Sequence, residues 1–101
     1  MNTHKVLNDE EISQALSELG GWYVKEGQIC AEFTFATFND AIRFINKVAS
    51  LAEEMNHHPE FCNSYNMVSF AYCTHDVDNK ITDTDIKIAL QINEAAKELQ
   101  N

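Results

Sequence analysis

Proline and glycine are scarce in this sequence, which has one proline and three glycines in 101 residues. Flexible linkers are rich in these residues, so their scarcity argues against a linker anywhere in the chain. No apolar run approaches the roughly 18 residues of a membrane-spanning helix. The opening stretch MNTHKVLNDEE lacks the apolar core of a secretory signal and the basic pattern of a transit segment. We therefore expect one soluble, cytoplasmic domain covering residues 1–101, with no membrane contact.

Positive charge is also scarce, because 7 Lys and Arg face 16 Asp and Glu for a formal net charge of -9. Nucleic-acid affinity depends on Lys and Arg that displace counterions from phosphates, so direct nucleic-acid binding is not expected. The acidity is spread along the chain, a pattern that favours solubility. The cysteines Cys30, Cys62 and Cys73 are odd in number and form no CxxC pair, which argues against a disulfide framework. We expect them to be reduced and mostly buried.

Apolar spacing predicts three helices. The first covers residues 8–19, with Asn8 and Glu11 at capping-box spacing and Gly20 as a stop. The second begins at Thr37 and its pattern ends near residue 55. Thr82 caps the third, which carries two apolar rows. The first row is Ile86, Ala89, Leu90 and Ala96, and the second is Ile88, Ile92, Ala95 and Leu99. We expect one row to face the core and the other a partner.

Alternating apolar residues predict two hairpins between these helices. Residues 22–24 and 28–36 form the first, with Ile29, Ala31, Phe33 and Phe35 on one face. Residues 61–75 form the second, with a turn near Tyr65 and Asn66 and with Val68, Phe70 and Tyr72 toward the core. The sequence therefore predicts an α+β fold: a four-stranded antiparallel sheet with three helices packed on one face, in the order α-β-β-α-β-β-α.

The stretch EEMNHHPEF places His57 and His58 directly before the only proline. Proline at position 59 disfavours helical backbone at His58, so the two imidazoles diverge from a stiff bend at a helix end. One interpretation is a pair of exposed histidines that cap this helix end. The other includes His75, which leaves the last strand and can approach the bend. Imidazole titrates near pH 6.5, so such a cluster suits acid-base chemistry. His4 lies outside the cluster and receives no role.

Several neighbouring residues allow both a structural and a functional interpretation. Asp85 can form a reciprocal cap with Thr82, or it can orient a histidine. Glu53, one turn before His57, is either a solvated helix residue or a partner that fixes a ring tautomer. Trp22 is either core or a stacking surface for a flat heterocycle. Adjacent histidines rarely bind one ion and no HExxH motif is present, so no metal site is expected.

The spacing of these residues resembles the pterin-4a-carbinolamine dehydratase family. The pattern is Glu53, three residues, His57-His58-Pro59, five residues, Tyr65, nine residues, His75 and a later Asp. The likeness covers nearly the whole chain. It includes GW at residues 21–22, FxFxxFxxA at residues 33–41 and TxxDxxxA at residues 82–89.

The resemblance implies a four-stranded sheet with three helices, assembled into homodimers or homotetramers. It also implies that water is lost from 4a-hydroxytetrahydropterin to give quinonoid dihydropterin, within tetrahydrobiopterin recycling and without a metal or organic cofactor. By matched position, His57, His58 and His75 form the catalytic acid-base set. We expect His58 and His75 to exchange the protons while His57 binds the pterin. The implied substrate-binding and supporting residues are Glu53, Pro59, Thr74, Asp85 and Trp22.

The sequence departs from the family pattern at three places. Asn56 replaces a frequent Asp, Phe61 replaces the usual Trp, and the segment between His75 and Asp85 is one residue longer than is common. The main alternative is a protein-interaction role without catalysis, of the transcription-factor dimerisation or RuBisCO-assembly type. The complete histidine set favours catalysis. A hydrolase that uses Cys73 as nucleophile beside His75 has little support.

Overall fold

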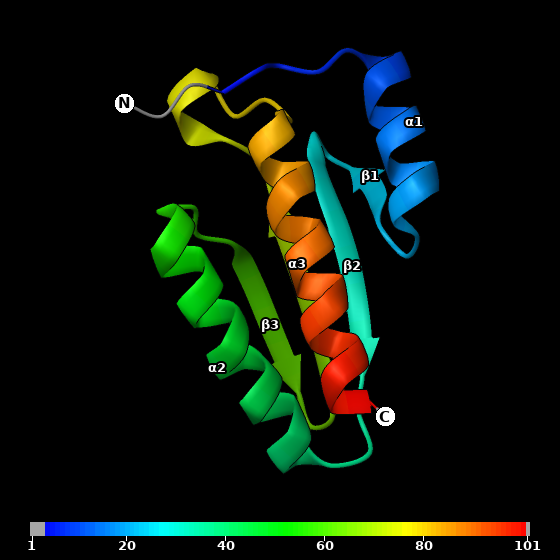
Figure 1. Ribbon diagram of the computed structural model, residues 1–101, viewed down its shortest axis with the longest axis vertical. Coiled ribbons are helices and arrows are strands. Elements are labelled where there is room, and N and C mark those ends of the chain that lie inside the picture. Colours follow the sequence, from blue (N-terminus) through cyan, green and yellow to red (C-terminus); the bar gives the residue numbers. More distant parts are fainter. Residues whose placement is uncertain (1–3, 101) are drawn as a thin grey trace.

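The computed structural model describes residues 4–100. Four strands form one antiparallel sheet in the order β1-β2-β4-β3, and three helices cover one of its faces (Figure 1). The elements are α1 (Asp9–Leu19), β1 (Tyr23–Lys25), β2 (Gln28–Thr34), α2 (Phe38–Met55), β3 (Glu60–Ser64), β4 (Met67–Tyr72), a 3-10 turn (His75–Val77) and α3 (Asp83–Gln100). The predicted fold class and element order are confirmed.

The helices begin where capping residues stand in the sequence. At α1 the backbone N–H of Glu11 donates to the side chain of Asn8 at 2.8 Å, and the N–H of Asn8 donates back to Glu11 at 3.0 Å. At α2 the N–H of Asp40 donates to Thr37 Oγ1 at 3.1 Å. Both predicted helix starts are confirmed, because these signals lie within one turn of the helix.

Both predicted hairpins are present. The first turns at Glu26 and Gly27, whose φ angles of 53° and 77° suit a tight connection between twisted strands. The second turns at Tyr65, with φ 53°, and Asn66. Alternate residues of the central strands face the helices and are buried, in β2 Ile29 and Ala31 and in β4 Val68, Phe70 and Tyr72.

Helix α3 lies over the middle of the sheet between α1 and α2 (Figure 1). The expectation that one of its apolar rows faces a partner is wrong, because neighbouring helices cover it on both sides. The buried apolar residues come from both rows: Ile88, Ala89, Ile92, Ala95 and Ala96. Among the two rows only Leu90, 52% exposed, points mainly to solvent. The two apolar rows of α3 thus pack within the same chain, because this helix lies at the centre of the helical layer.

Aromatic rings fill the core between α2 and the sheet. Phe44 is fully buried, and its ring centroid lies 5.0 Å from Phe33, 4.8 Å from Phe35 and 5.7 Å from Phe70. Trp22 is 5% exposed and its indole N–H donates to Asn93 Oδ1 at 2.8 Å. Within residues 4–100, no helix has the length and apolar character needed to cross a bilayer.

The cysteines are less buried than expected. Cys73 is buried, Cys30 is partly exposed and Cys62 is exposed. Cys30 lies between the buried residues Ile29 and Ala31, so strand alternation turns it to the face that the helices leave uncovered. The three thiols are free in the structure.

Candidate active site

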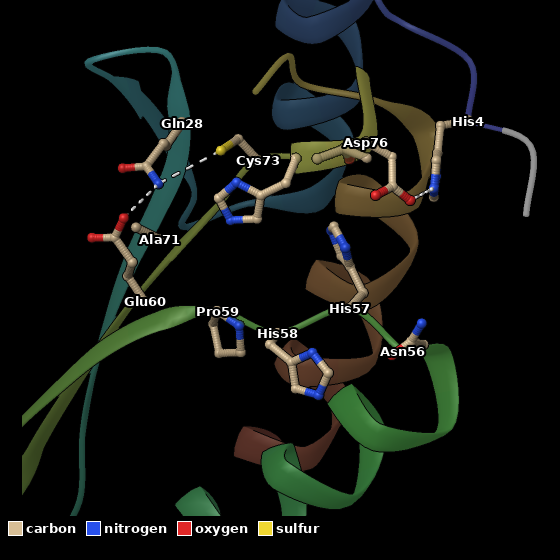
Figure 2. Close-up of a pocket in the computed structure, with 12 residues that line it drawn as sticks. His4, Gln28, Asn56, His57, His58, Pro59, Glu60, Ala71, Cys73 and Asp76 are labelled. Carbon is tan, nitrogen blue, oxygen red and sulfur yellow. Dashed lines mark hydrogen bonds and ion pairs between the residues drawn. The ribbon is translucent and has the colours of Figure 1, made fainter. Parts of the chain in front are cut away.

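The end of α2 delivers the adjacent histidines. Asn56 adopts a left-handed conformation, with φ 50° and ψ 46°, and the backbone N–H of His57 donates to the carbonyl of Ala52 at 2.9 Å. This hydrogen bond closes the helix in the manner of a Schellman motif. Pro59 then holds the chain extended into β3. The two imidazoles leave this bend on opposite sides, as Figure 2 shows.

His57 points inward and is held on several sides. Its side chain is 8% exposed, and its Nε2 lies 2.5 Å from Asp85 Oδ1. The ring stacks on Tyr72 with centroids 5.0 Å apart and planes inclined by 23°, while the Tyr72 hydroxyl donates to the His57 carbonyl at 3.1 Å. Burial, together with the charge of Asp85, raises the pKa of Tyr72, so the phenol remains a donor. Backbone and ring of His57 are therefore both fixed.

Asp85 is fully buried and receives hydrogen bonds from three residues. The backbone N–H of Thr82 donates at 2.8 Å, the hydroxyl of Thr74 donates at 3.0 Å, and His57 binds the other carboxylate oxygen. A buried carboxylate requires such compensation. Asp85 thus accepts from Thr82 at the start of α3 and pairs with His57, contacts that agree with both its structural and its functional interpretation.

His75 occupies the 3-10 turn that follows β4. Its Nδ1 lies 2.5 Å from Asn79 Oδ1, and an amide oxygen only accepts, so Nδ1 carries the hydrogen. In the neutral ring Nε2 is then the free acceptor. Asp78 and Asn79 have φ angles of 62° and 58°, and the turn closes where the N–H of Thr74 donates to Lys80 at 2.9 Å.

A cavity of about 260 Å³ lies between these two histidines. Pro59 and Ala71 supply apolar wall. Gln28 lies beside Ala71 at the edge of the cavity away from His57, and its amide donates to Glu60 at 3.4 Å and to Cys73 Sγ at 3.8 Å (Figure 2). The remaining lining residues are His4, Asn56, His57, His58, Cys73, Thr74, His75 and Asp76. Imidazoles around a small cavity with polar edges suit a flat, hydrogen-bonding ring.

The structure places the other predicted residues less centrally. His58 pairs with Glu53 at 3.0 Å, and the two side chains are 56% and 78% exposed at the rim. The Thr74 hydroxyl is engaged by Asp85 and by Thr82 at 2.7 Å, so it supports the carboxylate. Trp22 packs in the core and does not line the cavity.

Sequence reasoning missed His4, which lines the same cavity. No spacing rule connects residue 4 with a site made mainly by residues 56–76. The signal lies in backbone pairing between the start of the chain and the start of α3, where Val6 pairs with Thr82. Such long-range pairing has no local sequence signature.

The geometry gives no support to a cysteine nucleophile or a metal centre. Burial raises the pKa of Cys73, which disfavours the reactive thiolate, and its polar partner is Gln28. Across the described part of the chain, no three His, Cys, Asp or Glu side chains gather as metal ligands do.

Fold and cavity together define an α+β protein with a histidine-lined cavity at the end of an antiparallel sheet. Residues 5–95 match the family model described as "Pterin 4 alpha carbinolamine dehydratase". The chain belongs to the pterin-4-alpha-carbinolamine dehydratase family, as its motif spacing predicted.

Relatives agree with this assignment. A Metallosphaera sedula protein is 41% identical over 90% of this chain and 94% of its own length. A Prochlorococcus marinus protein is 42% identical over 87% of this chain and 91% of its own length. Both are named "Putative pterin-4-alpha-carbinolamine dehydratase".

Solved structures share the fold. A transcriptional coactivator/pterin dehydratase from Brucella melitensis superposes with a TM-score of 0.85 at 37% identity, covering 91% of this chain and 99% of that one. A pterin dehydratase-like protein identified as a RuBisCO assembly factor in the alpha-carboxysome gives a TM-score of 0.61 at 17% identity, covering 74% of this chain and 86% of that one. The second likeness concerns the fold alone.

Proposed function

We propose that this chain dehydrates 4a-hydroxytetrahydropterin to quinonoid dihydropterin by histidine acid-base catalysis, in the cytoplasmic recycling of tetrahydrobiopterin. The observation that carries the proposal is the buried Asp85–His57 pair facing the same cavity as His75. In the reaction the bond between C4a and its hydroxyl breaks, and a proton converts the hydroxyl into water. The neighbouring N5 loses its proton and the N5–C4a double bond forms. One acid and one base are therefore needed, and no oxidant.

The hydrogen-bond partners favour His57 as the acid. A carboxylate held against Nε2 orients the ring and stabilises its positive charge, as in other carboxylate-histidine pairs. The Nδ1 edge is then the edge available to protonate the departing hydroxyl. His75, with its hydrogen held on Nδ1 by Asn79, has Nε2 free to accept the N5 proton. This assignment differs from the sequence-based expectation, which paired His58 with His75.

The remaining lining residues suit recognition of the pterin. The 2-amino group and N3–H of the pterin are adjacent donors, and Glu60 offers a carboxylate at the cavity edge. Pro59 provides a flat wall, and Glu53 holds His58 at the rim. The chemistry requires proton transfer alone, so the proposal includes no metal or organic cofactor.

The test is the decay of chemically generated 4a-hydroxytetrahydropterin in the presence of wild-type protein and variants. We expect His57→Ala and His75→Ala each to lose about 10²- to 10⁴-fold in rate, because each removes one proton-transfer group. Asp85→Asn should lose activity while keeping the fold. His58→Ala serves as the matched control at the same bend and should lose less than either.

Equal decay rates with and without wild-type protein would reject catalysis and leave the interaction role as the better explanation. A His58→Ala loss as large as that of His75→Ala would instead reject the assignment of His57 as the acid. We propose further that the chain forms a homodimer or homotetramer.

A further inference from the structure

The N-terminal segment, residues 5–7, runs antiparallel beside residues 81–83. The backbone N–H of Asp83 donates to the carbonyl of Lys5 at 3.0 Å, and the N–H of Lys5 donates to the Asp83 side chain at 2.9 Å. In Figure 1 this segment, in blue, passes close to the yellow turn that carries the 3-10 helix. The pairing delivers His4 to the first turn of α3, beside the cavity.

The ring of His4 bridges two elements of the site. Its Nδ1 lies 2.8 Å from Thr84 Oγ1 in α3, and its Nε2 lies 3.4 Å from Asp76 Oδ2 in the 3-10 turn (Figure 2). The side chain is 9% exposed, and its ring centroid is 6.4 Å from that of His57. An imidazole this enclosed, with both nitrogens paired, is a fixed part of the cavity wall.

The two contacts of His4 depend differently on the charge of the ring. The contact between His4 Nε2 and the Asp76 carboxylate is an ion pair when the ring is protonated. In the neutral ring Nδ1 accepts from the Thr84 hydroxyl, and in the protonated ring Nδ1 donates to the same oxygen. The hydrogen bond to Thr84 therefore persists in either state, and the contact with Asp76 is strongest when the ring is protonated.

The two halves of the site differ in how firmly they are held. His57 and Asp85 are buried in the body of the fold. The turn with His75 has no buried residue, and its partner Asn79 belongs to the same loop, so that hydrogen bond moves with it. Segments with few buried contacts open most readily. The base of the turn is held by the backbone N–H of Thr74, which donates to Lys80, while the Asp76 side chain, 79% exposed, meets His4 as an ion pair at 3.4 Å.

We propose that His4 is a positioning residue: by tying Asp76 to the first turn of α3, it sets the distance of His75 from the His57–Asp85 pair. The inference deepens the proposed function and rests on it for its catalytic consequence. His4 itself transfers no proton in this scheme. Misplacement of a reacting group by about 1 Å costs up to about 10²-fold in rate. Loss of the contact between His4 and Asp76 should therefore lower the rate measurably.

The test uses the full chain with any tag at its C-terminus. We expect His4→Ala to lower kcat about 10- to 100-fold with a much smaller change in KM. His4→Gln places an amide donor near the position of Nε2 and should restore most of the activity. His4→Asn reaches only toward Thr84 and should not. Lys5→Ala, in the same segment but exposed and paired with Glu11, is the matched control and should behave as wild type.

Amide hydrogen exchange gives a readout that does not require catalysis. The N–H groups of Val77 and Asp78 donate within the turn at 3.4 and 3.2 Å, and both should exchange faster in His4→Ala. In an Asp76→Ala background His4→Ala should have no further effect, since the two act through one contact.

Unchanged exchange at Val77 and Asp78, or an unchanged kcat, would overturn the inference. An inactive wild type whose His4→Ala variant still loses protection would reject the dehydratase proposal and leave the tie standing.

Discussion

At the scale of single residues, a buried carboxylate organises the site. Asp85 has no exposed surface, and both its oxygens are paired, one with His57 and the other with Thr74 and Thr82. Removing one partner of such a buried group costs more than the hydrogen bond itself, because the remaining group stays desolvated. Asp85, His57 and Thr74 therefore constrain one another through buried hydrogen bonds.

The three thiols should react in an order set by burial. Cys62 is exposed, whereas burial raises the pKa values of Cys30 and Cys73. We expect a disulfide reagent at pH 7 to label Cys62 first and Cys73 at least about tenfold more slowly, because the thiolate is the reactive form. A raised pKa means that the thiolate appears only at higher pH, so labelling of Cys73 should accelerate above pH 9. Absorbance of the released thiol follows both phases.

Cys62→Ser is the control for this assignment. It should remove the fast phase and leave the slow phases unchanged. A fast phase that survives in Cys62→Ser would show that one of the other thiols is more open than the structure places it.

At the scale of elements, the end of α2 determines where His57 lies. Asn56 is left-handed there, a conformation that costs most residues roughly 1–2 kcal/mol and costs glycine little. We expect Asn56→Val to lower the free energy of unfolding by about 1–2 kcal/mol relative to Asn56→Gly, measured by urea denaturation with unchanged m-value. Equal midpoints for the two variants would mean that the helix end relaxes without strain.

Local signals explain how much of the fold the sequence predicts. The caps at Asn8 and Thr37 and the turns at Gly27 and Tyr65 each act within a few residues, so their elements are predictable. The role of α3 is different. Its two apolar rows do not reveal whether a second helix of the same chain or another molecule covers them, and only the assembled fold decides.

The same distinction applies to the site. The motif around His57, His58 and His75 predicts that these histidines form one cluster. It does not predict that each has a different hydrogen-bond partner, because those partners are set by the fold. Glu53 reaches His58 and not His57, because Pro59 turns the two rings apart. His4 joins through a partner 80 positions away. Contacts of that range are set by topology and leave no periodic pattern in the chain.

At the scale of the whole molecule, an apolar groove of about 250 Å³ lies beside α2 and the edge strand β3. Its lining includes Ile45, Ala49 and Phe61, and Phe61 is 52% exposed. Exposed apolar surface of this kind marks association sites. The groove, and not the covered helix α3, is therefore the surface that suits the proposed assembly.

Phe61→Glu should weaken that assembly. We expect wild-type protein to give a native mass of two or four 11.5 kDa chains, and Phe61→Glu to shift it toward one chain, because a charge would be buried at the contact. Val24→Glu is the matched control, since Val24 is 50% exposed on β1 at the opposite edge of the sheet. A monomeric wild type, or dissociation by Val24→Glu alone, would contradict this location.

The central place of α3 also bears on synthesis. This helix follows all four strands in the chain, yet it fills the space between α1 and α2 and carries Asp85, the partner of His57. A nascent chain that still lacks the 18 residues of α3 has no helix between α1 and α2. His57 then has no Asp85 to pair with. The pairing of His57 with Asp85 should therefore form only after the ribosome has released α3, so the assembled pair reports completed folding of this chain.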